Sequence, residues 1–514
     1  MNHLLCGLAA NPNLPPGLVD RLIGIADDDL AAELAARADL SRTQTTVLAA
    51  RGDEIAARLA YEGWLTASDV DPLVQPRAAL ALLDQGAGRP EWARLLASDP
   101  DPERREKLAA CPDLPPDVVA TLGTDPEIRV VAELALWTTT PDTAARFAEH
   151  PHAEVRCAVA ANEKAPPAVL AGLVGPAGGT GPPPARRCLV CDRERTPFVH
   201  DPSCPRTDCD LPADASCDGS HESTVRDMRQ RAVCNPATPV DAVLRFAEHP
   251  SMVMRGALAA RPDLPAHVFR RLAEDLVPGV RAALAENPAI DEALMRVLAT
   301  DNGHDVRRGL AHNPNVPLDV LTHLAGATRI GPVLLPRIAG ASPAEIASLA
   351  ASPVPGARML VAARRDLPPG IRDALAADPD AKVVASVAPH PGLSEARLRA
   401  MADRHGGRVV TGVAANPDTP AELLEDLARP QRAVRRALRD IARHRNATAR
   451  ALLPCLADAR ARHVAAGHPA LPERTIVELL EDDDRQVVEA AAANPSLPGA
   501  VMSRLGLRAT TGDS

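Results

Sequence analysis

Apolar positions along the chain fall into short clusters that prolines separate. In residues 280–286, Val280 and Leu284 are spaced to share one face of a helix, and Asn287-Pro288 then ends the segment. A second apolar segment follows over residues 291–298. Alternating β-branched residues are absent, and prolines come too often for a sheet ladder. The pattern therefore predicts pairs of short helices and no β-sheet.

This unit recurs along nearly the whole chain with a period of about 26 residues, giving about eighteen copies. One proline or equivalent residue marks each copy: Pro12, Ala38, Trp64, Ala87, Pro112, Thr138, Lys164, Pro236, Pro262, Pro288, Pro314, Gly340, Arg365, Pro391, Pro417, a blurred copy near Arg443, Pro469 and Pro495. Isolated helices below about 12 residues are marginal in water, so each unit needs its neighbours. We therefore expect an all-α solenoid whose repeats stack into one continuous core.

The repeat also resembles a known family. Residues 280–288 (VRAALAENP) and 306–314 (VRRGLAHNP) carry the pattern of the leucine-rich repeat variant family most clearly. The resemblance covers nearly all of residues 1–174 and 223–505. It implies a right-handed superhelix of alternating α- and 3₁₀-helices, and a cysteine-rich segment that binds a four-iron cluster. HEAT-like arrays are the alternative, although their units are longer, about 40 residues or more.

One insertion interrupts the period and divides the chain. The gap between the markers Lys164 and Pro236 exceeds one period by about 46 residues. We predict N-terminal repeats over 1–174, an insert over 175–222, C-terminal repeats over 223–505 and a disordered tail over 506–514. The insert begins with a Gly- and Pro-rich linker that has too little apolar content to pack.

The insert holds half of the ten cysteines, in the spacing C-x2-C-x12-C-x4-C-x7-C: Cys188, Cys191, Cys204, Cys209 and Cys217. A C-x2-C pair can place two thiolates on one ion or cluster, and a second pair completes four-coordination. The insert has few apolar residues, and their burial cannot fold the segment by itself. We therefore expect a bound metal ion or cluster to stabilise it. The first four cysteines form the expected ligand set, with Cys217 as a spare ligand. Disulfides or free thiols are the alternatives.

The last cysteine begins a short motif. Residues 217–221 read Cys-Asp-Gly-Ser-His, which resembles the hallmark of CDGSH-type iron–sulfur proteins and makes His221 a candidate ligand. That family also needs a C-x-C pair upstream, where this chain has Arg206 and Asp208, so the resemblance covers five residues only. The leucine-rich repeat variant resemblance favours an iron–sulfur cluster of the 4Fe-4S type, while the bare spacing also permits zinc.

Composition and charge argue against several classes of function. The net charge of −10 argues against broad phosphate-backbone binding, and 2% aromatic residues cannot supply stacking platforms. No apolar run reaches the roughly 18 residues of a membrane span, and the N-terminus lacks a signal-peptide pattern, so we expect a cytoplasmic protein with reduced thiols.

Other recurring residues have simpler interpretations. The remaining cysteines (Cys6, Cys111, Cys157, Cys234 and Cys455) are expected to be small structural residues. An arginine column (Arg105, Arg156, Arg229, Arg255, Arg281, Arg307 and Arg358) could bind an anionic partner, but we favour an internal ladder of ion pairs and carbonyl contacts. His150 and His249 are interpreted as turn residues, and the acidic run 481–484 as a solvated loop that caps a helix.

No phosphate loop, nucleophile elbow or zinc-protease motif is present in the sequence. The leading hypothesis is a non-enzymatic scaffold that binds a protein partner and carries a metal-stabilised module. The first alternative is an iron–sulfur redox sensor or electron-transfer protein. The second is nucleic-acid binding along the arginine column.

Overall fold

The computed structural model describes residues 2–175, 222–430 and 433–511, and over these ranges the chain is entirely helical. It contains 35 α-helices and two 3₁₀-helices, with no strand among the described residues. None of the helices in this part of the chain is long and apolar enough to cross a lipid bilayer. The prediction of an all-helical repeat array without a β-sheet is therefore confirmed.

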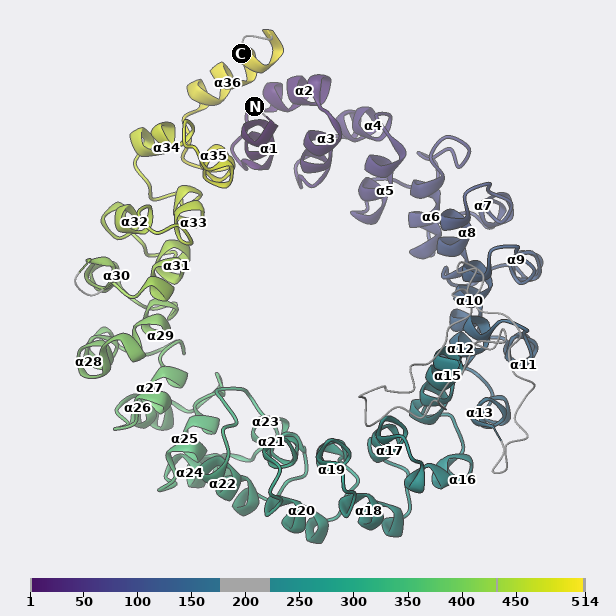
Figure 1. The fold of residues 1–514 in the computed structure, drawn as a ribbon. Helices are drawn as coiled ribbons and strands as arrows, with labels where there is room; N and C mark the ends of the chain where they lie inside the picture. The colour runs from purple at the N-terminus through teal and green to yellow at the C-terminus, as the bar shows by residue number, and fades with distance from the viewer. Residues whose placement is uncertain (1, 176–221, 431–432, 512–514) are drawn as a thin grey trace, which may run out of the picture. The chain divides into compact units, whose positions relative to one another are not determined.

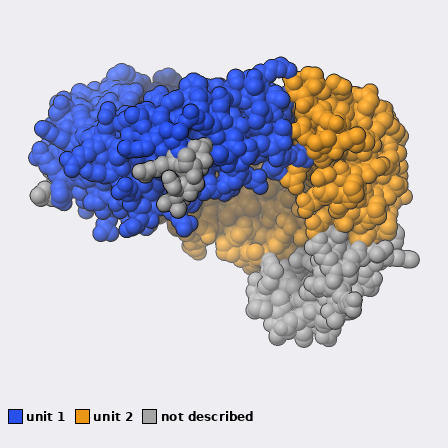
Figure 2. Space-filling model, turned by 90° about the horizontal axis from the view of Figure 1, so that it is seen from above, with its two compact units in different colours: residues 1–65, 331–514 blue, residues 66–330 orange. Residues whose placement is uncertain are grey.

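The repeats belong to two compact units, coloured separately in Figure 2. Unit 1 combines residues 1–65 with residues 331–514, and unit 2 is residues 66–330. The insert predicted at 175–222 thus falls inside unit 2 and does not separate the units. The boundaries that the sequence suggested differ from these, because contacts between stacked repeats continue on both sides of the insert.

Each repeat begins with a first helix, and there are eighteen of these in the described part of the chain, as the period predicts. In unit 1 they are α1 (Asn2–Ala10), α3 (Asp28–Ala35), α5 (Asp53–Tyr61), α23 (Pro336–Ala339), α25 (Pro355–Val361), α27 (Ala381–Val387), α29 (Val410–Ala414), α31 (Arg435–Arg443), α33 (Arg462–Ala466) and α35 (Arg485–Ala492). In unit 2 they are α6 (Pro76–Asp84), α8 (Pro102–Ala109), α10 (Ile128–Trp137), α12 (Ala153–Ala161), α15 (Glu222–Cys234), α17 (Met252–Ala259), α19 (Pro278–Glu286) and α21 (His304–His312). Within each unit the first helices line the concave side (Figure 1).

A second helix follows in most repeats and lies on the convex side of its unit (Figure 1). In unit 1 these are α2 (Pro16–Ile25), α4 (Arg42–Ala49), α24 (Pro343–Ala350), α26 (Pro369–Ala376), α28 (Glu395–His405), α30 (Ala421–Ala428), α32 (Ala449–Cys455), α34 (Glu473–Leu479) and α36 (Gly499–Thr511). In unit 2 they are α7 (Pro90–Leu96), α9 (Pro116–Leu122), α11 (Pro141–Ala148), α13 (Pro167–Val174), α16 (Val240–Val243), α18 (Ala266–Ala273), α20 (Glu292–Ala299) and α22 (Leu318–Ala327).

Two details differ from the expectations. The second helices are α-helical, whereas the family resemblance implied 3₁₀-helices; 3₁₀ geometry is confined to η1 (Leu244–Glu248) and η2 (Gly406–Arg408) in the described residues. Each second segment is long enough, at seven or eight residues in most repeats, to close α-type hydrogen bonds. Helix α36 extends to Thr511 and so includes most of the segment that we expected to be a disordered tail. Residues 512–514 lie outside the described residues.

Local sequence explains the helix boundaries. A proline occupies the first turn of many second helices, where its missing N–H costs nothing. Where proline is absent from that turn, a side chain can cap the helix: Asp291 accepts a hydrogen bond from the backbone N of Leu294 at 2.8 Å. The buried faces are Val280, Leu284 and Ala285 in α19, and Leu294 with its neighbours in α20.

In many repeats a buried asparagine bonds to the repeat before it. Asn313 directly follows helix α21, and its side chain is fully buried. Its Nδ2 donates to the carbonyl oxygens of Ala285 and Asn287, 28 and 26 residues earlier, at 3.0 and 2.7 Å. Its Oδ1 accepts from the backbone N of Asn315 at 2.9 Å. One amide thus satisfies two carbonyls that the end of helix α19 leaves without helical partners.

The same contact recurs along both units, and we call it the asparagine ladder. Its asparagines are Asn11, Asn162, Asn235, Asn287, Asn313, Asn416 and Asn494. Arginine or histidine makes the equivalent bond to an earlier carbonyl in other repeats, at Arg37, Arg261, Arg364, His444 and His468. The blurred copy that the sequence placed near Arg443 is therefore a repeat with His444 in the ladder position.

The ladder crosses the insert without a change of register. Asn235, after the insert, donates to the carbonyls of Ala160 and Asn162, before it, with both distances at 3.0 Å. Helices α12 and α15 pack directly against each other. The repeats before and after the insert therefore stack directly on each other within unit 2.

Within unit 1 the ladder also joins the two ends of the chain. Asn11 donates to the carbonyls of Ala492 and Asn494 at 2.9 and 2.7 Å, so α1 stacks on α35 as an ordinary next repeat. A Cβ on Gly7 would collide with the backbone oxygen of Glu489, which shows how closely the two helices approach. Gly309 lies at the corresponding position of α21, where its Cβ would meet the backbone oxygen of Ala282 at 2.8 Å.

We predict that Asn313→Ala destabilises unit 2 by about 2–4 kcal/mol, because two buried carbonyls lose their donors. The matched control is Asn315→Ala, which removes an exposed amide bonded to the carbonyl of Pro288 and should cost less than about 1 kcal/mol. Urea unfolding followed by circular dichroism measures both. Equal destabilisation by the two variants would contradict the ladder's role.

Candidate functional site

All the predicted metal ligands lie in one segment that the structure does not describe. Cys188, Cys191, Cys204, Cys209, Cys217 and His221 fall within residues 176–221, between α13 and α15. Over the described residues, no group of three or more His, Cys, Asp or Glu side chains is arranged to hold a metal ion. The cysteine-rich site therefore stays a prediction from the sequence.

The cysteines outside the insert act as small packing residues. Cys6, Cys111 and Cys455 are buried, and each Sγ bonds within its own segment, as Cys455 does to the carbonyl of Ala451 at 3.2 Å. Burial raises the pKa of the Cys6 and Cys157 thiols to about 11, and of the Cys111 and Cys455 thiols to about 12. Such thiols stay protonated at neutral pH, which confirms the structural interpretation for these four. Cys234 is exposed.

The arginine column is an internal ladder of ion pairs. Arg281 binds Asp301, twenty residues later, through Nε–Oδ2 at 2.7 Å and Nη2–Oδ1 at 3.0 Å. Its Nη1 also donates to the carbonyl of Asp275 at 2.6 Å, so one guanidinium joins the loops before and after its own repeat. The same two-point pairing links Arg105 to Asp125, Arg255 to Asp275, and Arg358 to Asp378. The internal interpretation is confirmed for these four arginines.

Three members of the column differ. Arg307 donates to Thr328 Oγ1 at 2.9 Å and to the carbonyl of Asp301, so it keeps the position without an acidic partner. Arg156 is buried, while Arg229 is exposed. The contacts of Arg105, Arg255, Arg281, Arg307 and Arg358 weigh against nucleic-acid binding along the column, because these guanidinium groups already bond to the fold; the hypothesis itself stays a prediction from the sequence.

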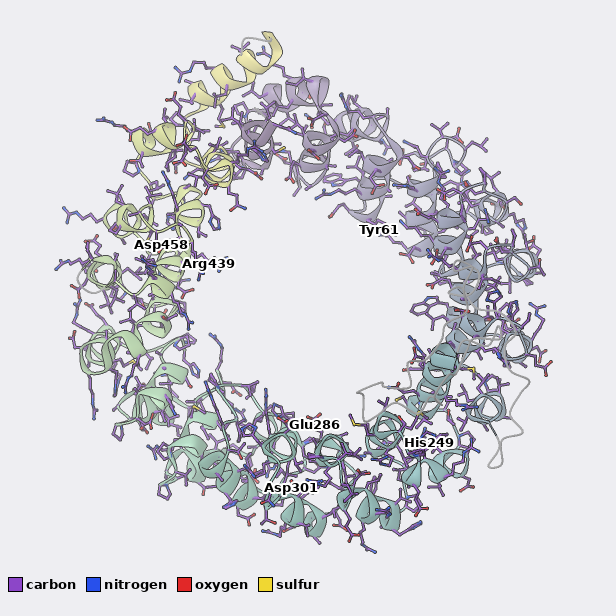
Figure 3. The ribbon with its side chains drawn as sticks, viewed as in Figure 1. Tyr61, His249, Glu286, Asp301, Arg439 and Asp458 are labelled. Atoms are coloured by element: carbon purple, nitrogen blue, oxygen red, sulfur yellow. The ribbon has the colours of Figure 1, made fainter. Side chains whose placement is uncertain are left out.

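Two smaller sequence interpretations are also supported. Nδ1 of His150 accepts from the backbone N of His152, and Nδ1 of His249 accepts from Ser251 N, each at 3.1 Å, as turn residues do. His249 is labelled in Figure 3. In the acidic run 481–484, Asp484 caps α35 by accepting from Gln486 N at 2.9 Å, and Asp482 forms an ion pair with Arg462. One part of that run is therefore structural rather than merely solvated.

Several first helices carry exposed side chains near their C-terminal ends. The residue just before the ladder position is Glu286 in α19 and Arg443 in α31, and both are exposed. In α10 the corresponding last residue is Trp137, whose exposed fraction is 58%. Tyr61, 54% exposed, ends α5. Figure 3 labels Tyr61 and Glu286 at these helix ends.

The sequence pattern did not predict that Trp137 is exposed, and it identified Asn287 only as part of an Asn-Pro pair that ends a helix. The signal for the ladder was present, since the asparagine before the marker proline recurs with the period. A polar residue at a fixed place between apolar faces indicates a buried partner, and the partner was a carbonyl of the preceding repeat. No such signal existed for Trp137, because exposure depends on packing.

Comparisons with known proteins show likeness of architecture only. No family model matches the chain, and no curated protein matches its sequence. Solved structures that match include a leucine-rich repeat variant with a repetitive structural motif (17% identity, TM-score 0.28, 54% of this chain and 87% of the other). Others are a structure of Kap95p with RanGDP (11%, 0.24, 96% and 72%) and one of the Pds5–Scc1 complex (13%, 0.16, 96% and 68%). At these values neither membership of the leucine-rich repeat variant family nor an activity follows.

The Arg281–Asp301 pair predicts an acid-sensitive contribution to stability. The hydrogen bonds from Arg281 hold the pKa of Asp301 below its usual value of about 3.9. The contribution is therefore present above about pH 4 and is lost as the pH falls through the lowered pKa. We expect Asp301→Asn to be less stable than the parent at pH 6, with the difference shrinking below about pH 4.

Urea midpoints between pH 7 and pH 2.5 measure this difference. The control is Asp305→Asn in α21, since the Asp305 side chain is 84% exposed and should change stability little at any pH. A difference between Asp301→Asn and the parent that stays constant with pH would refute the assignment.

Proposed function

We propose that the chain is a non-enzymatic helical-repeat scaffold that binds a protein partner along the concave side of its first helices. Repeat stacks present extended concave surfaces of this kind. The observation that carries the proposal is the contrast between two sets of side chains. The ladder residues and most arginines of the arginine column bond within the fold, whereas Trp137 is 58% exposed and first-helix arginines such as Arg439 and Arg443 are exposed.

Exposed Trp137 is the strongest single indication. The chain has only three tryptophans and one tyrosine, yet Trp137 and Tyr61 both stand at exposed first-helix ends. The indole Nε1 of Trp137 donates to Glu133 Oε1 at 2.7 Å, which holds the ring in one orientation. A pre-oriented aromatic side chain is the usual anchor of a protein interface, because it buries a large area at low entropic cost.

We predict that Trp137→Ala lowers recovery of a specific partner at least about tenfold when the tagged chain is purified from extracts of the cells that make it. The control is Leu276→Ala, a change at a 95% exposed apolar residue in the loop after α18. Quantitative mass spectrometry compares both with the parent. A parent chain that purifies alone under mild conditions, or partners unaffected by Trp137→Ala, would contradict the proposal.

The insert supplies a second part of the proposal, a metal-stabilised module. The support is the cysteine spacing and the small number of apolar residues in the insert, together with its location between two repeats that stack directly. Cys188, Cys191, Cys204 and Cys209 would be the ligands, with Cys217 or His221 as substitutes. An iron–sulfur cluster of the 4Fe-4S type is proposed first, with zinc as the alternative. If the cluster is redox-active, the scaffold would serve as a sensor or electron carrier.

Anaerobic purification followed by metal analysis and visible spectroscopy tests the module. We expect broad visible absorbance that bleaches on reduction, with iron and sulfide in the parent and loss of both in Cys188→Ser/Cys191→Ser. The control is Cys234→Ser, an exposed cysteine outside the insert, which should keep the spectrum. A colourless protein with stoichiometric zinc would select the alternative, and a metal-free parent would refute the module.

A further inference from the structure

Four consecutive repeats of unit 1 carry a basic residue at one repeat position. Lys382, Arg408, Arg436 and Arg460 each lie eight residues before the ladder position of their repeat, and we call them the basic column. All four side chains are exposed. Within the described part of the chain none of the four forms an ion pair or a side-chain hydrogen bond. The first segments that carry them, from α27 through α29 and α31 to α33, pack in sequence.

The basic column reverses the charge that several other repeats carry at this position. The position lies at or near the start of the first helix, where the helix dipole favours acidic side chains and disfavours basic ones. In five other repeats the position is acidic, at Asp29, Glu103, Glu154, Asp227 and Asp305, and in four it is uncharged, at Val253, Gly279, Gly356 and Gln486. In four adjacent repeats the side chain at this position is instead positively charged. This charge opposes the helix dipole and has no partner within the described part of the fold, so it gives the structure no benefit. Such departures from local preference are expected at functional surfaces.

Helix α31 adds three further arginines to this surface. Arg435, Arg439 and Arg443 are spaced four residues apart, so they project from one side of the helix next to Arg436. Like charges at this spacing destabilise a helix by about 0.2–0.5 kcal/mol per pair. None of the three has an ion-pair partner in the described residues, and Arg439 is labelled in Figure 3.

The acidic side chains near the basic column mostly accept hydrogen bonds from backbone N–H groups. Asp380 accepts from the backbone N of Lys382 at 2.8 Å, and Asp458, labelled in Figure 3, accepts from the backbone N of Arg460 at 3.0 Å. Asp440 is the acidic side chain of α31 itself and is partly buried. These three carboxylates keep their charge, but seven basic side chains (Lys382, Arg408, Arg435, Arg436, Arg439, Arg443 and Arg460) outnumber them, so the surface has a net positive charge in a chain whose total charge is −10.

A hollow lies between the first two members of the basic column. It has a volume of about 580 Å³ and is lined by Pro379, Asp380, Ala381, Lys382, Ala385 and Arg408. Its small alanine side chains leave room for an incoming side chain between the two basic groups. A carboxylate entering the hollow would lie close to both Lys382 and Arg408.

The spacing of the basic column matches that of side chains along an extended polypeptide segment. Packed helices lie about 8–10 Å apart, so successive column members are separated by about that distance. A polyproline II segment rises about 3.1 Å per residue with three residues per turn, which places every third side chain on one face about 9 Å apart. An acidic residue at every third position would thus meet one column member per repeat. A nucleic acid fits less well, because the described part of this surface lacks aromatic side chains for stacking.

We infer that the first-helix surface from α27 to α33 binds an extended acidic segment of a protein partner, with one carboxylate per repeat on Lys382, Arg408, Arg436 and Arg460. This inference rests on the proposed scaffold function and names the chemistry of its partner. Binding of this kind is driven by exposed charges, so its affinity falls steeply with added salt.

Fluorescence anisotropy with the full chain and a labelled (Glu-Pro-Pro)5 peptide tests the inference. We expect saturable, salt-sensitive binding, no binding of (Gln-Pro-Pro)5, and weaker binding of a peptide of the same composition whose five glutamates are contiguous. Arg436→Glu should weaken binding about tenfold, since it replaces an attraction by a repulsion. The matched control is Arg474→Glu, the same charge change on α34 at a side chain that is 91% exposed, which should leave binding unchanged.

The inference is overturned if the parent does not bind the peptide, or if Arg436→Glu and Arg474→Glu weaken peptide binding equally. Tighter binding of a single-stranded oligonucleotide than of the peptide would also overturn it. So would self-association of the chain that Arg436→Glu abolishes, because the surface would then be occupied by a second copy. Thermal melts confirm that both variants fold. If the peptide fails to bind while Trp137-dependent capture persists, the inference falls and the scaffold function stands. If the peptide binds while capture does not depend on Trp137, the inference stands and the role of Trp137 as an anchor falls.

Discussion

A buried or partly buried side chain that bonds to carbonyls of the preceding repeat is the contact on which the stack depends; it is an asparagine amide in seven repeats and an arginine or histidine in five others of the described chain. A helix of two turns leaves most of its terminal carbonyls without helical donors, and in this chain such ends recur every 26 residues or so. Asn313 and its equivalents supply the missing donors from the next repeat, so each helix end is satisfied only when its neighbour is in register. Apolar burial provides the driving force for stacking, and the amide determines which register is allowed.

Arginine has two separate roles in this protein, and geometry decides between them. Arg281 and its equivalents reach an aspartate in the following loop, so they are part of the fold. Arg460 and Arg462 are two residues apart, yet Arg462 forms an ion pair with Asp482 while Arg460 faces solvent. The number of basic residues alone would therefore not locate the proposed binding surface. The contacts of each side chain decide whether it belongs to the fold or is exposed.

Local stacking also explains why the chain tolerates an interruption. Because each repeat contacts chiefly its neighbours, residues can be inserted between α13 and α15 while Asn235 still reaches Ala160 and Asn162. The same locality lets Asn11 bond to Ala492 and Asn494, so the first repeat of unit 1 continues from the last. The proposed metal module would then be an addition to the scaffold that the stack does not need for its own order.

The sequence by itself determined the period, the pairing of short helices and the absence of strands from the described repeats, because proline, Asn-Pro breaks and apolar spacing act within one repeat. It also indicated that Arg281 and related residues bond internally, and it located the cysteine cluster whose structure the described residues do not include. Only the tertiary structure decided that the second segments are α-helical, that Asn313 reaches a carbonyl 28 residues earlier, and that Arg436 and Trp137 remain exposed. The physical reason is that partners and exposure depend on residues one repeat away, which local pattern does not specify.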